Sequence, residues 1–195
     1  MPTTEITAYF DNVVEVIANM PFAAVGRIVG VLMQAYESNR MIYLFGNGGS
    51  AALASHFACD LGKGTASGSG KRFQVLAFTD NVPLMTAWAN DARYEDIFAE
   101  QLINFVQPSD IAFAISGSGS SPNVLKALRV AHEAGAFTVG LTGFQGGDMV
   151  DLCDLCVIVP SDNMQIIEDL HLSVTHAVFT ALRAKIFQQN GAAIA

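Results

Sequence analysis

Two segments of the 195-residue sequence carry side chains that are able to transfer protons or to bind a metal ion. His56 and Asp60 stand four residues apart in an alanine-rich stretch, so on a helix they share one face. Glu168 and His176 stand in a second stretch with helical spacing of its apolar residues. Imidazoles that titrate near neutral pH and carboxylates are the usual partners in general acid–base catalysis, and both bind zinc. Such residues also occur as solvated surface pairs or as core histidines, so their types alone leave the function open.

The alanine-rich stretch begins at the glycine turn Gly46–Ser50, which follows the apolar run Met41–Phe45. This pattern predicts a strand, a tight turn and a helix that ends near Leu61. Glycines let a ligand approach the backbone, and a helix N-terminus offers free N–H groups, so we predict an anion site such as one for phosphate. The spacing matches neither the dinucleotide fingerprint nor the Walker loop, which argues against a nucleotide cofactor. Ser50 is able to cap the helix or to offer its hydroxyl to a ligand.

A row of serines, Ser116–Ser121, follows a second apolar run, Ile111–Ile115. Pro122 comes next and opens a predicted helix that extends over Val124–Ala134. A flexible linker has the same composition, but a linker is not expected between a buried strand and a regular helix. We therefore predict a second anion-binding loop, built from hydroxyls and N–H donors at a helix N-terminus. His132 lies far from the start of this helix, and we assign it no role.

The remaining pattern alternates strands with helices. Strands are predicted at Met41–Phe45, Phe73–Phe78, Ile111–Ile115, Phe137–Leu141 and Leu155–Val159. Further helices are predicted at Val82–Asn90 and Tyr94–Phe105, and a loop at Gly62–Lys71. Strands that read as continuous apolar runs between helices predict an α/β fold, a parallel sheet of five strands with helices on both faces. Ligands of such sheets bind at the carboxyl ends of the strands, where both turns would lie.

The chain is predicted to form a single domain, residues 1–195. Residues 1–39 read as an N-terminal helical arm that Pro21 divides into two helices, and this arm is able to cover the sheet or to contact another subunit. Residues 40–190 form the α/β core, which ends in a long helix from Pro160 to Gln189.

The composition narrows the class of protein. Hydrophobic residues make up 51% and charged residues 14%, an apolar balance that favours burial in an oligomer interface. A net charge of −8 without a Lys/Arg cluster argues against nucleic-acid binding. The sequence has no apolar run of roughly 18 residues and no basic-apolar leader, so we predict no membrane partner and a cytoplasmic location. Cys153 and Cys156 form a single Cys-x-x-Cys pair without a second pair, which we interpret as structural.

Taken in order, the motifs resemble those of the sedoheptulose 7-phosphate isomerases, or phosphoheptose isomerases, of the sugar-isomerase (SIS) domain superfamily. The resemblance rests on Gly46–Ala52, His56–Ala58, Ala89–Asp91, Ser116–Ala127, Gly140–Gly143, Val159–Asn163 and Glu168–His176. It implies a Rossmann-like SIS fold and a homotetramer with active sites shared between subunits. The implied reaction is an aldose–ketose isomerisation of sedoheptulose 7-phosphate to D-glycero-D-manno-heptose 7-phosphate.

The resemblance also implies a role for individual residues. Asp60 and His176 would form the acid–base pair. The phosphate would be held by the loop residues Ser116, Gly117, Ser118 and Ser121. The sugar would contact Asn47, Gly48, Ser50, Asp91 and Glu168. A divalent metal ion, zinc, would be bound in each site by His56, Asp60, Glu168 and His176.

Three positions depart from the family pattern. Asp60 stands where the family has Glu, which moves the carboxylate back by one methylene, and Glu168 stands where the family has Gln. Gly117 takes the place of the usual Thr and removes one hydroxyl from the phosphate loop. These changes leave two alternatives open: an isomerase of a different sugar phosphate, and a sugar-phosphate-binding regulator or assembly protein without catalysis. His171, on the same helix as His176, fits a core histidine.

Overall fold

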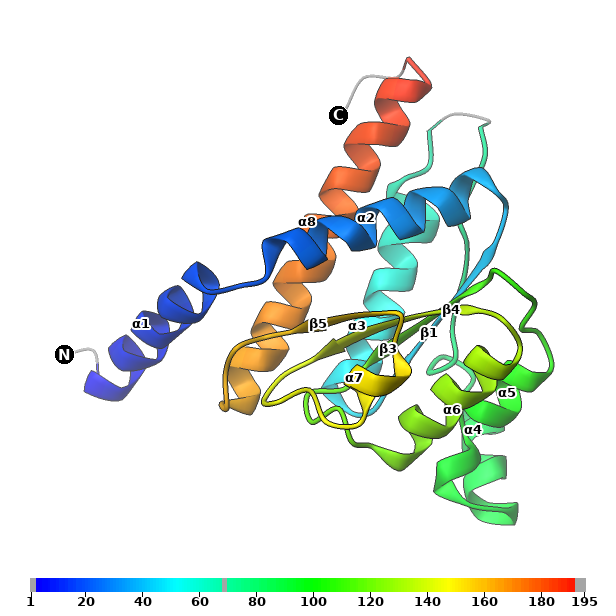
Figure 1. Cartoon of the computed structure of the whole chain (residues 1–195), viewed down its shortest axis with the longest axis horizontal. Coiled ribbons are helices and arrows are strands. Elements are labelled where there is room, and N and C mark those ends of the chain that lie inside the picture. The colour runs from blue at the N-terminus through cyan, green and yellow to red at the C-terminus, as the bar shows by residue number, and fades with distance from the viewer. Residues whose placement is uncertain (1–2, 68–69, 192–195) are drawn as a thin grey trace.

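A parallel sheet forms the centre of the structure, a computed structural model that describes residues 3–67 and 70–191 (Figure 1). Its strands are β1 (Met41–Gly46), β2 (Gln74–Ala77), β3 (Ile111–Ile115), β4 (Phe137–Thr142) and β5 (Leu155–Ile158). Within the described residues the sheet has five strands in the order β2-β1-β3-β4-β5, and every pair is parallel. The predicted fold class is confirmed.

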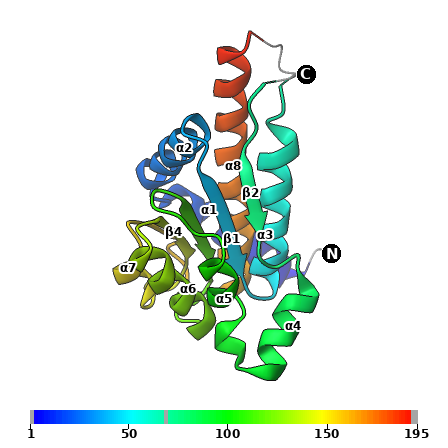
Figure 2. The ribbon, with the colours of Figure 1, turned by 90° about the vertical axis from the view of Figure 1, so that its right-hand side faces the viewer.

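Helices cover both faces of this sheet (Figure 2). One face carries α2 (Phe22–Glu37), α3 (Gly49–Cys59) and α8 (Met164–Gln189), and the other carries α4 (Val82–Asp91), α5 (Ala99–Ile103), α6 (Pro122–Glu133) and α7 (Met149–Leu152). Successive strand residues point to opposite faces, so Leu44 joins the core under α2, α3 and α8, whereas Phe45 joins the core under α5 and α6. A sheet buried on both sides explains why its strands read as unbroken apolar runs.

The N-terminal arm divides as the sequence predicts. Helix α1 (Thr4–Ala18) ends before Pro21, and α2 starts directly after it, at an angle of 69° to α1. Helix α2 buries Ile28 and Leu32 against the sheet, whereas none of the described residues of α1 is buried. Figure 1 shows α1 extending away from the body of the molecule. By length and hydropathy, no described helix could cross a membrane alone, and only the bent pair of α1 and α2 passes that test.

Two local predictions differ from the structure, and one short helix was not predicted. The helix predicted over Tyr94–Phe105 is broken into the 3-10 helix η2 (Tyr94–Asp96) and α5, because Asp96 turns inward to an ion pair with Lys126 of α6. The helix that carries His56 changes at Asp60 into a π-helix, η1 (Asp60–Gly64), which replaces the first part of the predicted loop. The short helix α7 was not predicted from the sequence.

Candidate active site

The two predicted anion-binding turns meet at the carboxyl edge of the sheet. Strands β1 and β3 are neighbours, with Gly46 paired to Ile115, so the glycine turn and the serine loop leave adjacent strands side by side. A Cβ atom on Gly46 would lie 2.5 Å from the Ile115 carbonyl oxygen, which explains the glycine there. Gly48, at φ +53°, precedes α3 as its N-cap. Of the two roles that the sequence leaves open for Ser50, the structure does not show the capping role, because Ser50 lies buried inside the first turn.

Helices α3 and α8 bring the predicted catalytic residues together. The Nε2 atoms of His56 and His176 are 2.9 Å apart, and Asp60 Oδ2 lies 3.6 Å from the first and 3.9 Å from the second. Among the described residues these three offer ligand atoms that all lie within 4.8 Å of one another. Half of each imidazole is exposed, whereas the Asp60 carboxylate is 19% exposed. The cluster is thus open to solvent on its histidine side and backed by protein at its carboxylate.

Glu168 lies in the wall of the cavity that contains His56 and His176, but its carboxylate is not part of the cluster of His56, Asp60 and His176. The cavity measures about 420 Å³ and runs between α3 and α8, with Gly49, Ser50, His56 and His176 in its wall. The Glu168 carboxylate packs against Gly49, where a Cβ atom would lie 3.0 Å from Oε1. It therefore faces the N-terminus of α3, eight residues, or about 12 Å along α8, from His176.

His171 lies in the wall of this cavity as a core histidine. It is 1% exposed, and burial lowers its pKa to about 4, against a smaller opposing effect of its hydrogen bond to Thr142. Because a carbonyl only accepts, the His171 Nε2–H donates to the Thr142 oxygen at 3.1 Å. Neutral His171 thus fastens α8 to the end of β4.

The serine loop is fixed by its neighbours. Gly143 N donates to the Gly117 carbonyl at 2.9 Å, and the Ser116 and Ser121 hydroxyl oxygens lie 3.3 Å apart. Ser118 is exposed, and its hydroxyl accepts a hydrogen bond from Ser120 N. A Cβ atom on Gly117 would lie 2.5 Å from the sulfur of Met164, so the first turn of α8 fills the space that a larger residue would need.

Two residues that the sequence did not single out, Asn123 and Tyr94, hold the predicted ligand residue Asn47. Asn123 exchanges two amide hydrogen bonds with Asn47, and the Tyr94 hydroxyl donates a third. The position of Asn123 directly after Pro122 at a helix start was the available signal, but spacing alone does not reveal a partner 76 residues away. Asp91 ends α4 in an exposed position, where its carboxylate accepts a hydrogen bond from Asn90 Nδ2 at 2.7 Å.

Comparison with known proteins identifies the family to which this chain belongs. Residues 7–143 match the family model of the SIS domain. A phosphoheptose isomerase of Paramagnetospirillum magneticum is 40% identical over 158 residues, which are 81% of this chain and 82% of that protein. A phosphoheptose isomerase of Bradyrhizobium sp. is 37% identical over 166 residues, 85% of this chain and 83% of the relative. The chain belongs to the phosphoheptose isomerase family of SIS domain proteins.

A solved structure agrees with this assignment. The phosphoheptose isomerase of Neisseria gonorrhoeae superposes with a TM-score of 0.87 at 25% sequence identity, over 94% of this chain and all of that one. The family resemblance inferred from the motifs is therefore confirmed.

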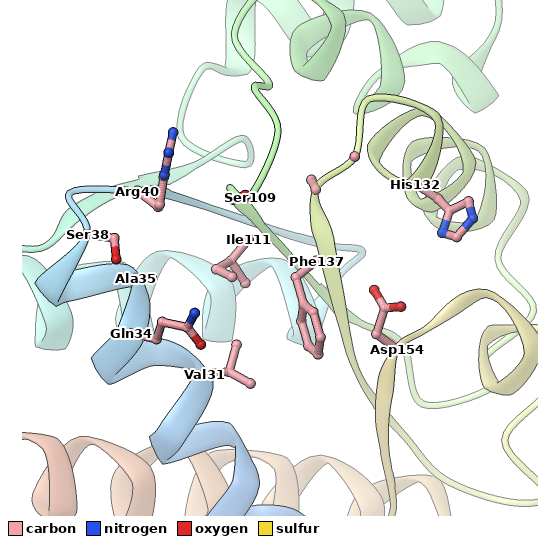
Figure 3. Close-up of a pocket in the computed structure, with 12 residues that line it drawn as sticks. Val31, Gln34, Ala35, Ser38, Arg40, Ser109, Ile111, His132, Phe137 and Asp154 are labelled. Carbon is pink, nitrogen blue, oxygen red and sulfur yellow. The ribbon is translucent and has the colours of Figure 1, made fainter.

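In this member of the phosphoheptose isomerase family, a second cavity lies at the opposite edge of the sheet (Figure 3). It measures about 490 Å³ and lies where β3 and β4 begin, with Ile111, Phe137 and His132 in its wall. Figure 3 shows the Arg40 side chain directed away from Phe137. This cavity lies at the amino ends of the strands, far from both predicted anion-binding turns, so the cavity between α3 and α8 is the stronger candidate for the functional site.

The cysteine pair lies outside both cavities just described. Cys153 and Cys156 are free thiols that both pack against Gly140 in β4, where a Cβ atom would lie 2.9 Å and 3.2 Å from the two sulfurs. A hydrogen bond from Cys153 lowers the pKa of Cys156 and raises that of Cys153. These contacts agree with the structural interpretation of the pair.

Proposed function

We propose that this chain isomerises sedoheptulose 7-phosphate to D-glycero-D-manno-heptose 7-phosphate. The observation that carries the proposal is the cluster of His56, Asp60 and His176, whose two histidines line a cavity between two helices that both start at the carboxyl edge of the sheet. Family membership supports it, because the curated relatives are named phosphoheptose isomerases. No observation on the described residues favours a different sugar phosphate or a binding protein without catalysis.

The proposed chemistry moves one proton between neighbouring carbons. A base removes a proton from C1 of the ketose, and the electron pair forms the enediol while the C2 oxygen gains a proton. Return of a proton to C2, with loss of the C1 hydroxyl proton, gives the aldehyde. Asp60 and His176 share these transfers: a carboxylate and an imidazole 3.9 Å apart are able to serve both the carbon and the oxygen atoms.

The remaining predicted residues are assigned to binding. The serine loop, with Ser116, Gly117, Ser118 and Ser121, would hold the phosphate at the N-terminus of α6. The sugar hydroxyls would contact Asn47, Gly48, Ser50, Asp91 and Glu168. Of these, Ser50 and Glu168 line the cavity that contains the two histidines, which supports their assignment.

The cluster also suits a divalent metal ion. Two imidazole nitrogens and one carboxylate oxygen form a donor set typical of catalytic zinc sites with an open position, and the 4.8 Å spread of the ligand atoms fits one ion. Zinc bound by His56, Asp60 and His176 would polarise the substrate carbonyl. Glu168 stays a prediction as a fourth ligand, since its carboxylate lies outside the cluster. The Nε2 lone pair of His176 is able to bind a metal ion or a proton, but not both at once. Zinc bound to this atom would therefore change the acid–base role of His176.

We further propose a homotetramer whose subunits share their active sites. Helix α1 supports this proposal with a stripe of exposed apolar side chains on its outer face: Ile6, Phe10, Val14 and Ile17. The exposed fraction of these side chains is 42% to 67%. A helix that packs only within its own chain would leave much less apolar surface exposed. The cytoplasmic location remains a prediction from the sequence.

Turnover of sedoheptulose 7-phosphate by the purified protein tests the proposal. The assay should be run after chelation, with added zinc, and with other ketose phosphates as competing substrates. We expect conversion of sedoheptulose 7-phosphate in preference to shorter ketose phosphates. Tight binding of sugar phosphates without any turnover, with or without zinc, would contradict the isomerase assignment.

A further inference from the structure

The Asn47 side chain is held by a set of hydrogen bonds that we call the asparagine clamp, formed by Asn47, Asn123 and Tyr94. Asn47 Nδ2 donates to Asn123 Oδ1 at 2.9 Å, and Asn123 Nδ2 donates back to Asn47 Oδ1 at 2.8 Å. The Tyr94 hydroxyl donates to the same Asn47 oxygen at 3.1 Å. Asn123 is 2% exposed, whereas Asn47 is half-buried at the start of the glycine turn.

The backbone decides which way the two amides point. Val124 N–H is a fixed donor, and it lies 3.0 Å from the Asn123 side chain, so the atom facing it is the oxygen Oδ1. Asn123 Nδ2 must then face Asn47, and Asn47 must offer its oxygen in return. The orientation of both amides therefore follows from a main-chain group rather than from a choice between two equal arrangements.

Most of the hydrogen-bonding capacity of the Asn47 side chain is used within the protein. Asn47 Oδ1 accepts from Asn123 and from Tyr94, which uses both of its lone pairs. Asn47 Nδ2 carries two hydrogens, and the hydrogen bond to Asn123 uses one of them. A single N–H is left, so the side chain of Asn47 meets a ligand as a donor and recognises an oxygen that accepts.

We propose that Asn123 and Tyr94 are positioning residues that orient this free N–H of Asn47 toward an oxygen of the bound sugar phosphate. The inference rests on the proposed function, which assigns Asn47 to the sugar. The position of the clamp supports it: Tyr94 follows Asp91 by three residues, and Asn123 follows Ser121 by two. The clamp thus joins three separate segments that carry predicted ligand contacts, and it sets their relative positions.

A double-mutant cycle read in ligand affinity tests the clamp. The variants are Tyr94→Phe, Asn47→Ala and the combination, and the dissociation constant for sedoheptulose 7-phosphate is measured by calorimetry. We expect Tyr94→Phe to weaken binding about two- to tenfold, the range of one net hydrogen bond, because Asn47 is free to rotate without the hydroxyl. In the Asn47→Ala background the same change should alter affinity by less than about twofold, since no amide remains to be oriented.

Two further variants separate positioning from folding. Tyr36→Phe removes a hydroxyl that donates to the Lys71 carbonyl at 3.2 Å, and this matched control should leave affinity unchanged. Asn123→Asp keeps an acceptor for Val124 N–H and Asn47 Nδ2 but cannot donate to Asn47 Oδ1, so it should weaken binding with little loss of folding cooperativity.

The possible outcomes decide between the two proposals. Equal effects of Tyr94→Phe in both backgrounds, or no effect on affinity in either, would overturn the clamp. If the unmodified protein binds the sugar phosphate without converting it, the isomerase proposal fails, and the cycle still decides the clamp because it is read in binding. If the unmodified protein does not bind the sugar phosphate, both proposals fail.

Discussion

Asp60 differs from the glutamate of the family pattern, yet its carboxylate still lies beside His56 and His176. The shorter carboxylate lies 3.6 Å and 3.9 Å from the two histidine nitrogens, close enough for one ion or one shared proton to join the three. Its position at the start of the π-helix η1 is notable, because π-helical turns often occur at functional sites. The departure at Asp60 is therefore compatible with catalysis.

Glu168 departs from the family pattern with an added charge, and its replacement separates binding from stability. The carboxylate faces both the N-terminus of α3 and the cavity expected to hold an anionic substrate. Glu168→Gln should lower KM for the sugar phosphate severalfold by removing a like charge, and should lower the free energy of unfolding by about 0.3–1 kcal/mol through the lost helix-dipole interaction. Steady-state kinetics and denaturant titration measure both.

The matched control is the neighbouring carboxylate, Asp169, which accepts a hydrogen bond from the Tyr9 hydroxyl at 2.5 Å. Asp169→Asn makes the same change of charge one residue away, at a group already engaged by α1. An identical drop in KM for both variants would show a general charge effect rather than a local role of Glu168.

His171 gives the folded protein a dependence on pH. The pKa of His171 is about 4 in the folded chain and 6.5 without burial. Between these two pH values the unfolded state binds a proton that the folded state does not bind. This contribution to stability is present above pH 6.5 and is lost as the pH falls from 6.5 toward 4. We expect about 3 kcal/mol less stability from this residue at the lower end of the range.

Unfolding titrations between pH 4 and pH 7 measure this loss. The variant His171→Gln should flatten the pH dependence, whereas His132→Gln, at an exposed histidine, should leave the slope unchanged. Equal slopes in the unmodified protein and in His171→Gln would contradict the role assigned to the buried imidazole.

At the scale of elements, the approach of η1 to α8 sets the distance between Asp60 and His176. A Cβ atom on Gly64 would lie 2.6 Å from the ring of Phe179, which follows His176 by three residues on the same helix. Gly64→Ala should therefore push η1 away from α8, reduce kcat and cost about 1–3 kcal/mol of stability through overpacking. Thermal unfolding and turnover of the variant measure both effects.

A second glycine serves as the control for this prediction. Gly26 lies exposed in α2, and among the described residues no heavy atom that could clash approaches within 4 Å of the Cβ site. Gly26→Ala should raise stability by about 0.4–1 kcal/mol, because alanine is the better helix former.

Restoration of kcat in the double variant Gly64→Ala, Phe179→Ala would support the steric explanation, and unchanged kcat in Gly64→Ala would refute it.

These elements also show what a sequence is able to predict. The five parallel strands and the long helix α8 were predicted because their patterns are long and local; the structure adds that Asn163 caps α8 by accepting from Gln165 N and Ile166 N. The break at Asp96 was not predicted, because an ion pair with the distant Lys126 accompanies it, and the π-helix at Asp60 was not predicted either. Asn123 and Tyr94 were not recognised as partners of Asn47, because they lie far from it in the sequence. The proximity of His56 and His176, in contrast, followed from the family motifs.

At the scale of the whole molecule, the proposed tetramer depends on helix α1. Phe10 and Val14 are 62% and 67% exposed within the single chain, and we expect them to be buried between subunits. Phe10→Asp should shift the protein toward smaller species, because a charge in an apolar interface costs several kcal/mol unless it is paired. Light scattering coupled to size-exclusion chromatography measures the change.

Asn12→Asp places the same charge on the same helix, outside the apolar stripe, and should leave the mass unchanged. A single-chain mass for the unmodified protein would contradict the tetramer. If Phe10→Asp dissociates the tetramer and also abolishes turnover, the result would support active sites shared between subunits.

The most direct test of the central claim follows the proton itself. Sedoheptulose 7-phosphate is incubated with the protein in D₂O, and deuterium at C1 and C2 is followed by NMR for the unmodified protein, Asp60→Asn and His176→Gln. We expect solvent deuterium to enter the carbon that gains the proton, and each variant to lower its rate by about 10²- to 10⁴-fold, the usual contribution of a general acid or base. Unchanged deuterium exchange together with unchanged conversion in both variants would contradict proton transfer by Asp60 and His176.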